Sequence, residues 1–168
     1  MRSFSLLVLL LLLSACGSGS QGSAGTDANA LQPLPVAGAA TLRINTQGAS
    51  ADTVLYGAQF TLRFPPGISL PAATGQGLLP AGVLIPAAGG SYAGANYLDS
   101  AAGAGPTLQV NISHPSGFTV GPLAAVNCTV APGVEYGAGD VTLENFSARD
   151  ADGAHIPGIT ATATLQTK

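Results

Sequence analysis

The segment at residues 55–64 constrains the fold of this chain most, because apolar and polar side chains alternate along it. Its even-numbered residues from 58 to 64 are apolar, and its odd-numbered residues from 59 to 63 are polar. Such alternation is typical of a β-strand with one face in a core and the other in water. A Pro-Pro-Gly sequence follows directly and ends the strand, because proline cannot donate a hydrogen bond to a neighbouring strand.

Similar short segments recur along the chain between turn-forming residues. The chain holds 23 glycines and 12 prolines, only 8% of its residues are charged, and no useful length of it has the period of an amphipathic helix. The sequence therefore predicts an all-β fold, a single sandwich of two sheets. The further expected strands lie at 41–46, 92–99, 107–113, 123–130, 141–148 and 159–166, with shorter ones near 70 and at 83–85.

Two local features of these strands can be predicted as well. Segments 92–99 and 107–113 should pair as a hairpin. Along 141–148 the inward set changes from odd-numbered residues (141 and 143) to even-numbered ones (146 and 148), which predicts a β-bulge at Glu144-Asn145. Turns are expected at 115–117, 132–133 and 150–153.

The N-terminus has the three parts of an export signal. Arg2 is followed by eight consecutive apolar residues at 6–13 and then by small residues up to Cys16. A helix needs about 20 apolar residues to span a membrane, so this segment is too short to be a permanent anchor.

The end of the signal, Leu-Ser-Ala-Cys at 13–16, resembles the lipobox of bacterial lipoproteins. The resemblance implies diacylglycerol on the sulfur of Cys16, cleavage before Cys16 and acylation of the new amine. Several acyl chains anchor a protein far more firmly than one. Gly17 rather than Asp follows the cysteine, which by family analogy favours the outer membrane over the inner membrane, with the protein facing the periplasm or the outside. The alternative is an ordinary signal peptide with an incidental cysteine.

The chain is therefore expected to have three parts: a lipoprotein signal peptide at 1–15, the lipidated cysteine with a flexible tether at 16–38, and one β-sandwich domain at 39–168. The tether consists almost entirely of Gly, Ser, Ala, Asn, Gln and Pro, which bury too little surface to offset the entropy of ordering. A flexible chain of this length would hold the domain about 25 Å from the membrane on average.

Charge and cysteine content exclude some functions. The chain has 5 basic and 8 acidic residues and no basic cluster, which argues against nucleic acid as a partner. If Cys16 is acylated, Cys128 has no partner in its own chain. It lies in the apolar half of segment 123–130, so we expect a buried thiol that packs as a small apolar group. The alternatives are a reactive thiol or an intermolecular disulfide.

Three stretches of the domain carry a resemblance to a known family. They are GAQFTLRFPPGISL, TLQVNISHPSGFTVGPLAAVNCTV and VTLENFSARDADGAHIPG. In order, they give an aromatic strand with a proline turn, then a strand running into a Gly-Phe turn and a "G-x-L-A-x-V" strand, and finally a strand ending in a "D-A-D-G" turn. This order resembles that of cohesin domains and related carbohydrate-binding sandwiches. The resemblance covers about residues 41–166. It implies a nine-stranded jelly-roll β-sandwich of cohesin type with a binding role, most often for dockerin modules.

The resemblance also implies where a protein partner would bind. Cohesins that bind dockerins place polar, partly acidic residues on the outward face of the aromatic strand, where this chain has Gln59, Thr61 and Arg63. This chain has no dockerin, tandem repeat or catalytic module beside the domain, so its partner would be a dockerin-like or other envelope protein. The residues expected to bind it are Gln59, Thr61, Arg63, Gln109, Asn111 and Ser113.

Two other functions stay open at this point. A carbohydrate-binding lipoprotein would use exposed aromatic rings to hold a sugar. The chain has four tyrosines and no tryptophan, and the residues expected to recognise a polysaccharide are Tyr92 and Tyr97. A structural subunit of a surface or envelope assembly would use a sheet edge for strand addition.

The sequence does not favour an enzyme, a cofactor or a metal site. It has no Gly-x-Ser-x-Gly motif at a strand-to-helix turn and no cysteines or histidines at zinc-ligand spacing around His114 and His155. Asp150 and Asp152 resemble the start of a calcium loop, but Ile159 stands where the closing acidic residue of an EF-hand would be. An Asp-Gly turn is therefore favoured over a calcium site at this position.

Overall fold

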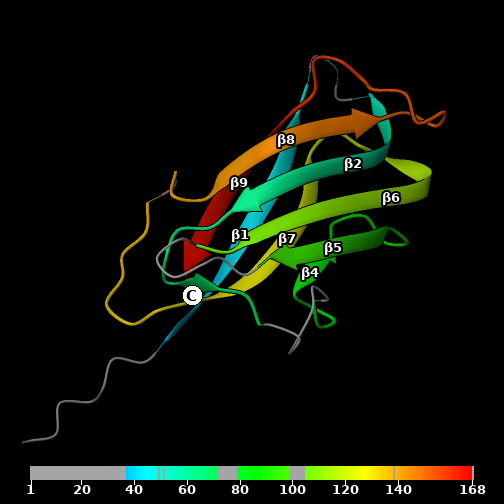
Figure 1. The fold of residues 1–168 in the computed structure, drawn as a ribbon. Helices are drawn as coiled ribbons and strands as arrows, with labels where there is room; N and C mark the ends of the chain where they lie inside the picture. The colour runs from blue at the N-terminus through cyan, green and yellow to red at the C-terminus, as the bar shows by residue number, and fades with distance from the viewer. Residues whose placement is uncertain are drawn as a thin grey trace, which may run out of the picture. The chain divides into compact units, whose positions relative to one another are not determined.

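The computed structural model describes residues 37–48, 50, 52–71, 79–98, 105–137 and 139–167. Within these residues the regular structure is entirely β-strand, which confirms the predicted all-β fold (Figure 1). The strands are β1 (Gly38–Gln47), β2 (Val54–Arg63), β3 (Ile68–Ser69), β4 (Leu84–Pro86), β5 (Tyr92–Leu98), β6 (Thr107–Thr119), β7 (Pro122–Val130), β8 (Thr142–Arg149) and β9 (Thr160–Thr167).

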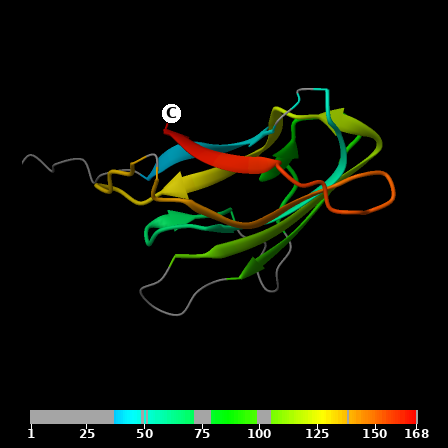
Figure 2. The ribbon, with the colours of Figure 1, turned by 90° about the horizontal axis from the view of Figure 1, so that it is seen from above.

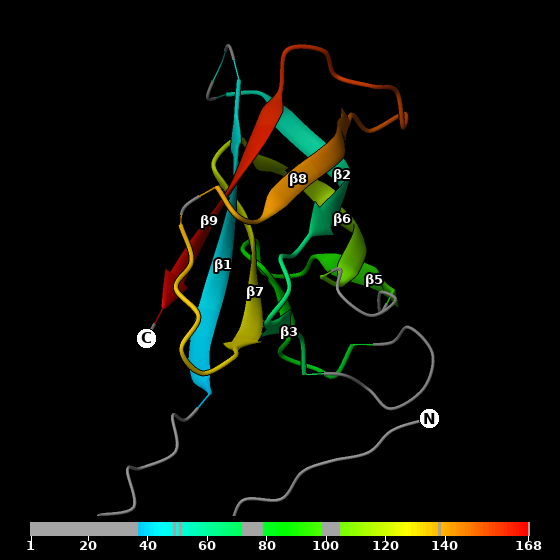
Figure 3. The same cartoon turned by 60° about the vertical axis from the view of Figure 1, so that its left-hand side comes forward.

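The strands form two antiparallel sheets. One sheet has the order β3-β7-β1-β9, with β4 also paired to β7, and the other has the order β5-β6-β2-β8. Figure 2 shows the sheets as two layers, and Figure 3 shows the strands of each sheet lying side by side. The pairing of β5 with β6 confirms the predicted hairpin.

The core lies between the two sheets, where the apolar halves of the alternating segments meet. Leu62 and Leu108 enter it from the four-stranded sheet, while Leu42 and Val126 enter it from the other sheet, and all four have no exposed surface. Burying each such side chain contributes about 1.5–3 kcal/mol. The inward residues are therefore fixed by packing, and the alternation leaves the side chains between them on the outward faces.

β8 carries the predicted bulge. Gln59 of β2 pairs with Ser147, but Thr61 pairs with Glu144, so one residue of β2 faces two residues of β8. One of these two is Asn145, whose φ of 54° lies in the left-handed region. Asparagine adopts this region more readily than most residues with a Cβ. The bulge returns the later part of β8 to a register in which its apolar side chains face the core.

β6 is longer than predicted. The expected turn at 115–117 lies inside the strand, which continues to Thr119, and the register with β2 shifts between Leu55 and Gly57. Gly117 has a φ of 75°, which this irregular segment needs and a glycine adopts without strain. The turn-forming residues therefore produce an irregularity within a strand rather than a connection between strands.

Candidate functional site

The six residues predicted to bind a protein partner all lie on the outward face of the four-stranded sheet. They are Gln59, Thr61, Arg63, Gln109, Asn111 and Ser113. Gln59 pairs with Asn111 and Thr61 pairs with Gln109 across the ladder between β2 and β6. Paired residues in a ladder share a face, and Phe60 and Val110, which alternate with these residues along β2 and β6, are buried, so the side chains between them point outward.

A shallow hollow of about 450 Å³ crosses this face from β5 to β8. Four of the predicted residues line it, and three further residues that were not predicted join them on its outward side. We call it the amide hollow, and its outward lining consists of Gln59, Thr61, Gly94, Asn96, Gln109, Asn111 and Asn145.

Two backbone features open the hollow. Gly94 of β5 has no side chain, and a Cβ there would meet no heavy atom within 4 Å. Asn145 reaches the hollow because the bulge in β8 inserts it between the ladder pairs. The alternation of segment 92–99 could have predicted that Asn96 shares a face with Tyr92. The hollow itself depends on how β5 and β8 pair, and this pairing is not visible in either segment alone.

The polar side chains of the amide hollow are neutral, and each carries hydrogen-bonding groups. An Asn or Gln amide offers two donors and an acceptor, and a Thr hydroxyl offers both roles. Within the part of the chain that the structure describes, none of these side chains makes a hydrogen bond to another protein group. Their hydrogen-bonding groups are therefore available to water or to a ligand.

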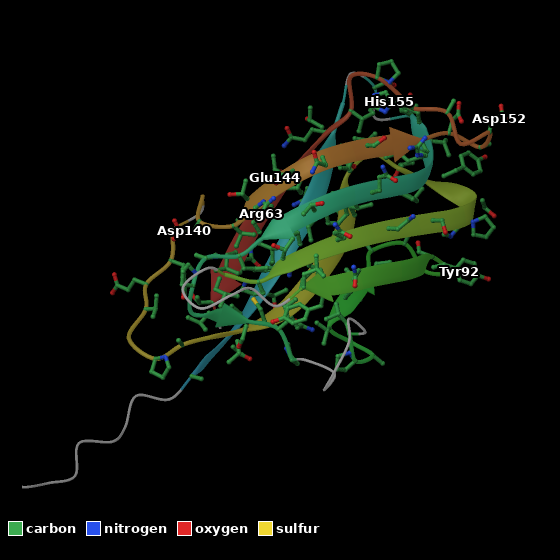
Figure 4. The ribbon with its side chains drawn as sticks, in the orientation of Figure 1. Arg63, Tyr92, Asp140, Glu144, Asp152 and His155 are labelled. Carbon is green, nitrogen blue, oxygen red and sulfur yellow. The ribbon has the colours of Figure 1, made fainter. Side chains whose placement is uncertain are left out.

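Arg63 stands at one end of this face and is paired. Its Nε donates to Oε2 of Glu144 at 2.7 Å, and the two side chains are 59% and 36% exposed. Figure 4 shows the pair on the outward side of β2 and β8. The positive charge of Arg63 and the negative charge of Glu144 compensate each other. Arg63 does not line the amide hollow.

A second hollow of about 490 Å³ adjoins the first at the other end of the sheet. We call it the tyrosine hollow, and its lining includes Tyr56, Tyr92, Ser113, His114, Arg149 and Asp150. The two hollows share Asn111. Tyr92 is 72% exposed, and Figure 4 shows it at the end of β5, away from Arg63.

The charged and imidazole groups of the tyrosine hollow are held by the fold. Nη1 of Arg149 donates to the carbonyl of Gly153 at 2.8 Å. Nδ1 of His114 accepts the amide proton of Ser116 at 3.1 Å, and its Nε2 lies 3.0 Å from the carbonyl of Gly89. With Nδ1 as the acceptor, Nε2 carries the proton and the ring is oriented by the backbone on both sides.

The structure separates the two tyrosines that were predicted to bind carbohydrate. Tyr92 lies outward opposite Ser113, whereas Tyr97 pairs with Leu108 and packs against the core. The two side chains therefore lie on opposite faces of β5, and Tyr92 is the one on the outward face. Tyr56, a half-buried residue at the irregularity of β2, lies beside Tyr92 in its place.

Asp150 organises the turn that follows β8. Its Oδ1 accepts the amide protons of Asp152 at 3.0 Å and of Ala154 at 2.8 Å, which is the pattern of an Asx turn. Figure 4 shows Asp152 and His155 on this turn. Among the described residues, no three His, Cys, Asp or Glu side chains gather closely enough to hold a metal ion. The geometry at Asp150 is that of the turn favoured by the sequence.

The two cysteines differ in what the structure shows. Cys16 lies outside the described residues, so its predicted lipidation stays a prediction. Cys128 is 4% exposed and free, which confirms the predicted buried thiol. Burial raises the pKa of the Cys128 thiol to about 11, so it stays protonated and poorly nucleophilic at neutral pH.

Within the described part of the chain, no helix has the length and apolar character needed to cross a membrane.

Comparison with known proteins finds no relative of this chain, since no protein family, curated protein or solved structure matches it.

Proposed function

We propose that this chain is a lipid-anchored, extracytoplasmic binding protein without catalytic activity, and that it holds its ligand on the outward face of the four-stranded sheet. One observation carries the proposal. A hollow crosses all four strands of this sheet, and its six polar side chains are neutral and without hydrogen-bond partners among the described residues. A sandwich whose face is held rigid by the core below it presents such groups in fixed positions, as a binding site requires.

The sequence supplies the rest of the proposal. Lipidation at Cys16 would attach the chain to the outer membrane, and the tether would let the domain reach partners near that surface. The resemblance to cohesins suggests the nine-stranded jelly-roll form of the sandwich and a binding role. The observed pair of antiparallel sheets is consistent with that form.

Two ligand classes fit the proposed function. The resemblance to cohesins implies a protein partner in the envelope. The exposed ring of Tyr92 beside the amide hollow favours a polysaccharide instead, because aromatic rings stack on the apolar faces of sugars. In both cases the ligand would cover the same face.

The test is capture of the ligand by the full-length protein in gently extracted native envelopes. Gly94→Thr adds a side chain in the amide hollow where a Cβ meets nothing, so it should fill the hollow and leave the fold intact. Thr162→Gln, on an exposed outward position of β9 in the other sheet, is the matched control.

We expect the wild type and Thr162→Gln to retain the same protein or polysaccharide, and Gly94→Thr to lose it. Equal retention by all three proteins, or no retention by any of them, would contradict the proposed function.

A further inference from the structure

We infer that the amide hollow and the tyrosine hollow together bind a neutral carbohydrate chain. This inference rests on the proposed function, because it names the class of ligand that the proposed face would hold. Three observations carry it: the neutrality of the amide hollow, the unpaired state of its amides, and the exposed tyrosine beside it.

The neutrality of the amide hollow argues against a charged ligand. No lysine, arginine, aspartate or glutamate lines it. Of the nearby charges, Arg63 pairs with Glu144, and the lining of the tyrosine hollow holds both Arg149 and Asp150. A polyanionic glycan or an acidic peptide would lack a compensating cation in the amide hollow.

The lining is also a poor match for a protein partner. Protein interfaces depend on a few buried anchor residues, most often Trp, Tyr or Arg, that are packed near the centre of the contact. The centre of this face holds amides and a threonine, and its exposed aromatic residue, Tyr92, stands to one side.

The amides match a sugar closely in chemistry. Each hydroxyl of a neutral sugar can donate and accept a hydrogen bond, and each Asn or Gln side chain offers both roles in one plane. Gln59, Gln109 and Asn111 belong to two adjacent strands, so the Cα atoms that carry these side chains are spaced at about 5 Å across the ladder and about 7 Å along it. A row of amides at regular spacing suits a ligand with repeating hydroxyls.

Tyr92 supplies the apolar part of the site. Sugar rings have one or two apolar faces, and an exposed aromatic ring can cover them while its hydroxyl stays in water. Asn111 lines both hollows, so the two are adjacent. Along β6, Gln109 and Ser113 are separated by about 14 Å at the usual rise of a strand, which is long enough for a short oligosaccharide.

The test is affinity electrophoresis of the full-length protein in detergent gels that each contain one soluble polysaccharide. The neutral probes are mixed-linkage glucan, galactomannan, dextran and the neutral polysaccharide fraction of the producing cell's own envelope. The acidic probes are alginate and polygalacturonate. The variants are Tyr92→Ala and Gly94→Thr, and Ile85→Ala, which removes an exposed apolar side chain from the other sheet, is the matched control.

We expect at least one neutral probe to slow the wild type and Ile85→Ala equally, with Tyr92→Ala and Gly94→Thr binding it about tenfold more weakly. Three results would overturn the inference: no neutral probe slows the protein, only acidic probes slow it, or both variants are slowed as much as the wild type. If the inference fails in this way while Gly94→Thr still abolishes capture of a protein from the envelope, the proposed function stands with a protein ligand. If capture is also insensitive to Gly94→Thr, both fail.

Discussion

The two outward faces of this domain are built on the same strand pattern but differ in what their polar side chains do. On the β3-β7-β1-β9 sheet, Thr41 and Arg43 of β1 lie beside Asn127 of β7 and Gln166 of β9. We call this surface the threonine face, since Thr160, Thr162 and Thr164 also lie on it. The other surface carries the amide hollow.

On the threonine face two pairs of polar side chains bond to one another across the strands. Thr41 Oγ1 donates to Oδ1 of Asn127 at 3.0 Å, and Arg43 Nε donates to Oε1 of Gln166 at 2.8 Å. In the amide hollow, no comparable bond joins the described side chains. A polar group that already has a protein partner gains little from a ligand, whereas a group bonded only to water can exchange it for one. We therefore expect the bonded side chains of the threonine face to contribute to stability, and the proposed binding to occur at the amide hollow.

The largest expected effect separates the core from both faces. Leu62→Ala removes a fully buried side chain directly next to Thr61 in β2, and should lower the free energy of unfolding by about 2–5 kcal/mol. Thr61→Ala should change it by less than about 0.5 kcal/mol, because its side chain points outward and has no protein partner among the described residues. Urea denaturation measures both. A loss for Thr61→Ala as large as that for Leu62→Ala would mean that the outward face is part of the packing.

The bulge is the next most sensitive feature. Asn145→Val places a β-branched residue at a φ of 54°, which should cost about 1–2 kcal/mol of unfolding free energy. Asn145→Gly should cost little in stability, but it removes an amide from the hollow and should weaken ligand retention. Thr162→Val, at an ordinary strand position of the threonine face, serves as the control and should be neutral. Equal stability of Asn145→Val and Thr162→Val would contradict the left-handed bulge.

Removal of one amide from each face tests the comparison directly. Asn127 accepts a hydrogen bond from Thr41 and donates one to the carbonyl of Gly82 at 2.8 Å, so Asn127→Ala should cost about 1 kcal/mol of stability. Asn111→Ala should leave stability unchanged within about 0.5 kcal/mol and reduce ligand retention. Thermal unfolding measures the stability of both variants, and envelope capture measures their ligand retention. A loss of stability in Asn111→Ala together with a loss of retention in Asn127→Ala would contradict the proposed roles of the two faces.

The smallest effect is expected at the ion pair between Arg63 and Glu144. Both side chains are substantially exposed, so Arg63→Met should change the unfolding free energy by less than about 1 kcal/mol, and less again at high salt. Ligand retention should not change, because Arg63 does not line the amide hollow. A tenfold loss of retention in Arg63→Met would move the binding site toward this end of the sheet.

Much of this arrangement could be predicted from the alternation of side chains. The parity of residues 58–64 placed Gln59 and Thr61 on the outward face, because a strand has a period of two and its apolar half must enter the core. The same parity rule predicts that Tyr92 and Tyr97, five residues apart in one strand, point to opposite faces, and in the structure Tyr92 lies outward while Tyr97 packs against the core.

Other parts of the site could not be predicted, because they depend on contacts between distant segments. The hollow forms where Gly94 of β5 and Asn145 of β8 are brought to the two sides of β2 and β6, more than 50 positions apart in the chain. The turn expected at 115–117 lies inside β6, where residues 114–117 have no partner in β2 and the pairing resumes at Phe118.

The most direct measurement of the central claim is photocross-linking from both faces in the native envelope. A diazirine amino acid about as long as glutamine is incorporated at position 109 in the amide hollow or at position 162 on the threonine face of the full-length protein. We expect cross-links to a ligand from position 109 that disappear when Gly94→Thr is added, and none from position 162. Equal cross-linking from the two positions, or cross-linking from position 162 alone, would contradict this claim.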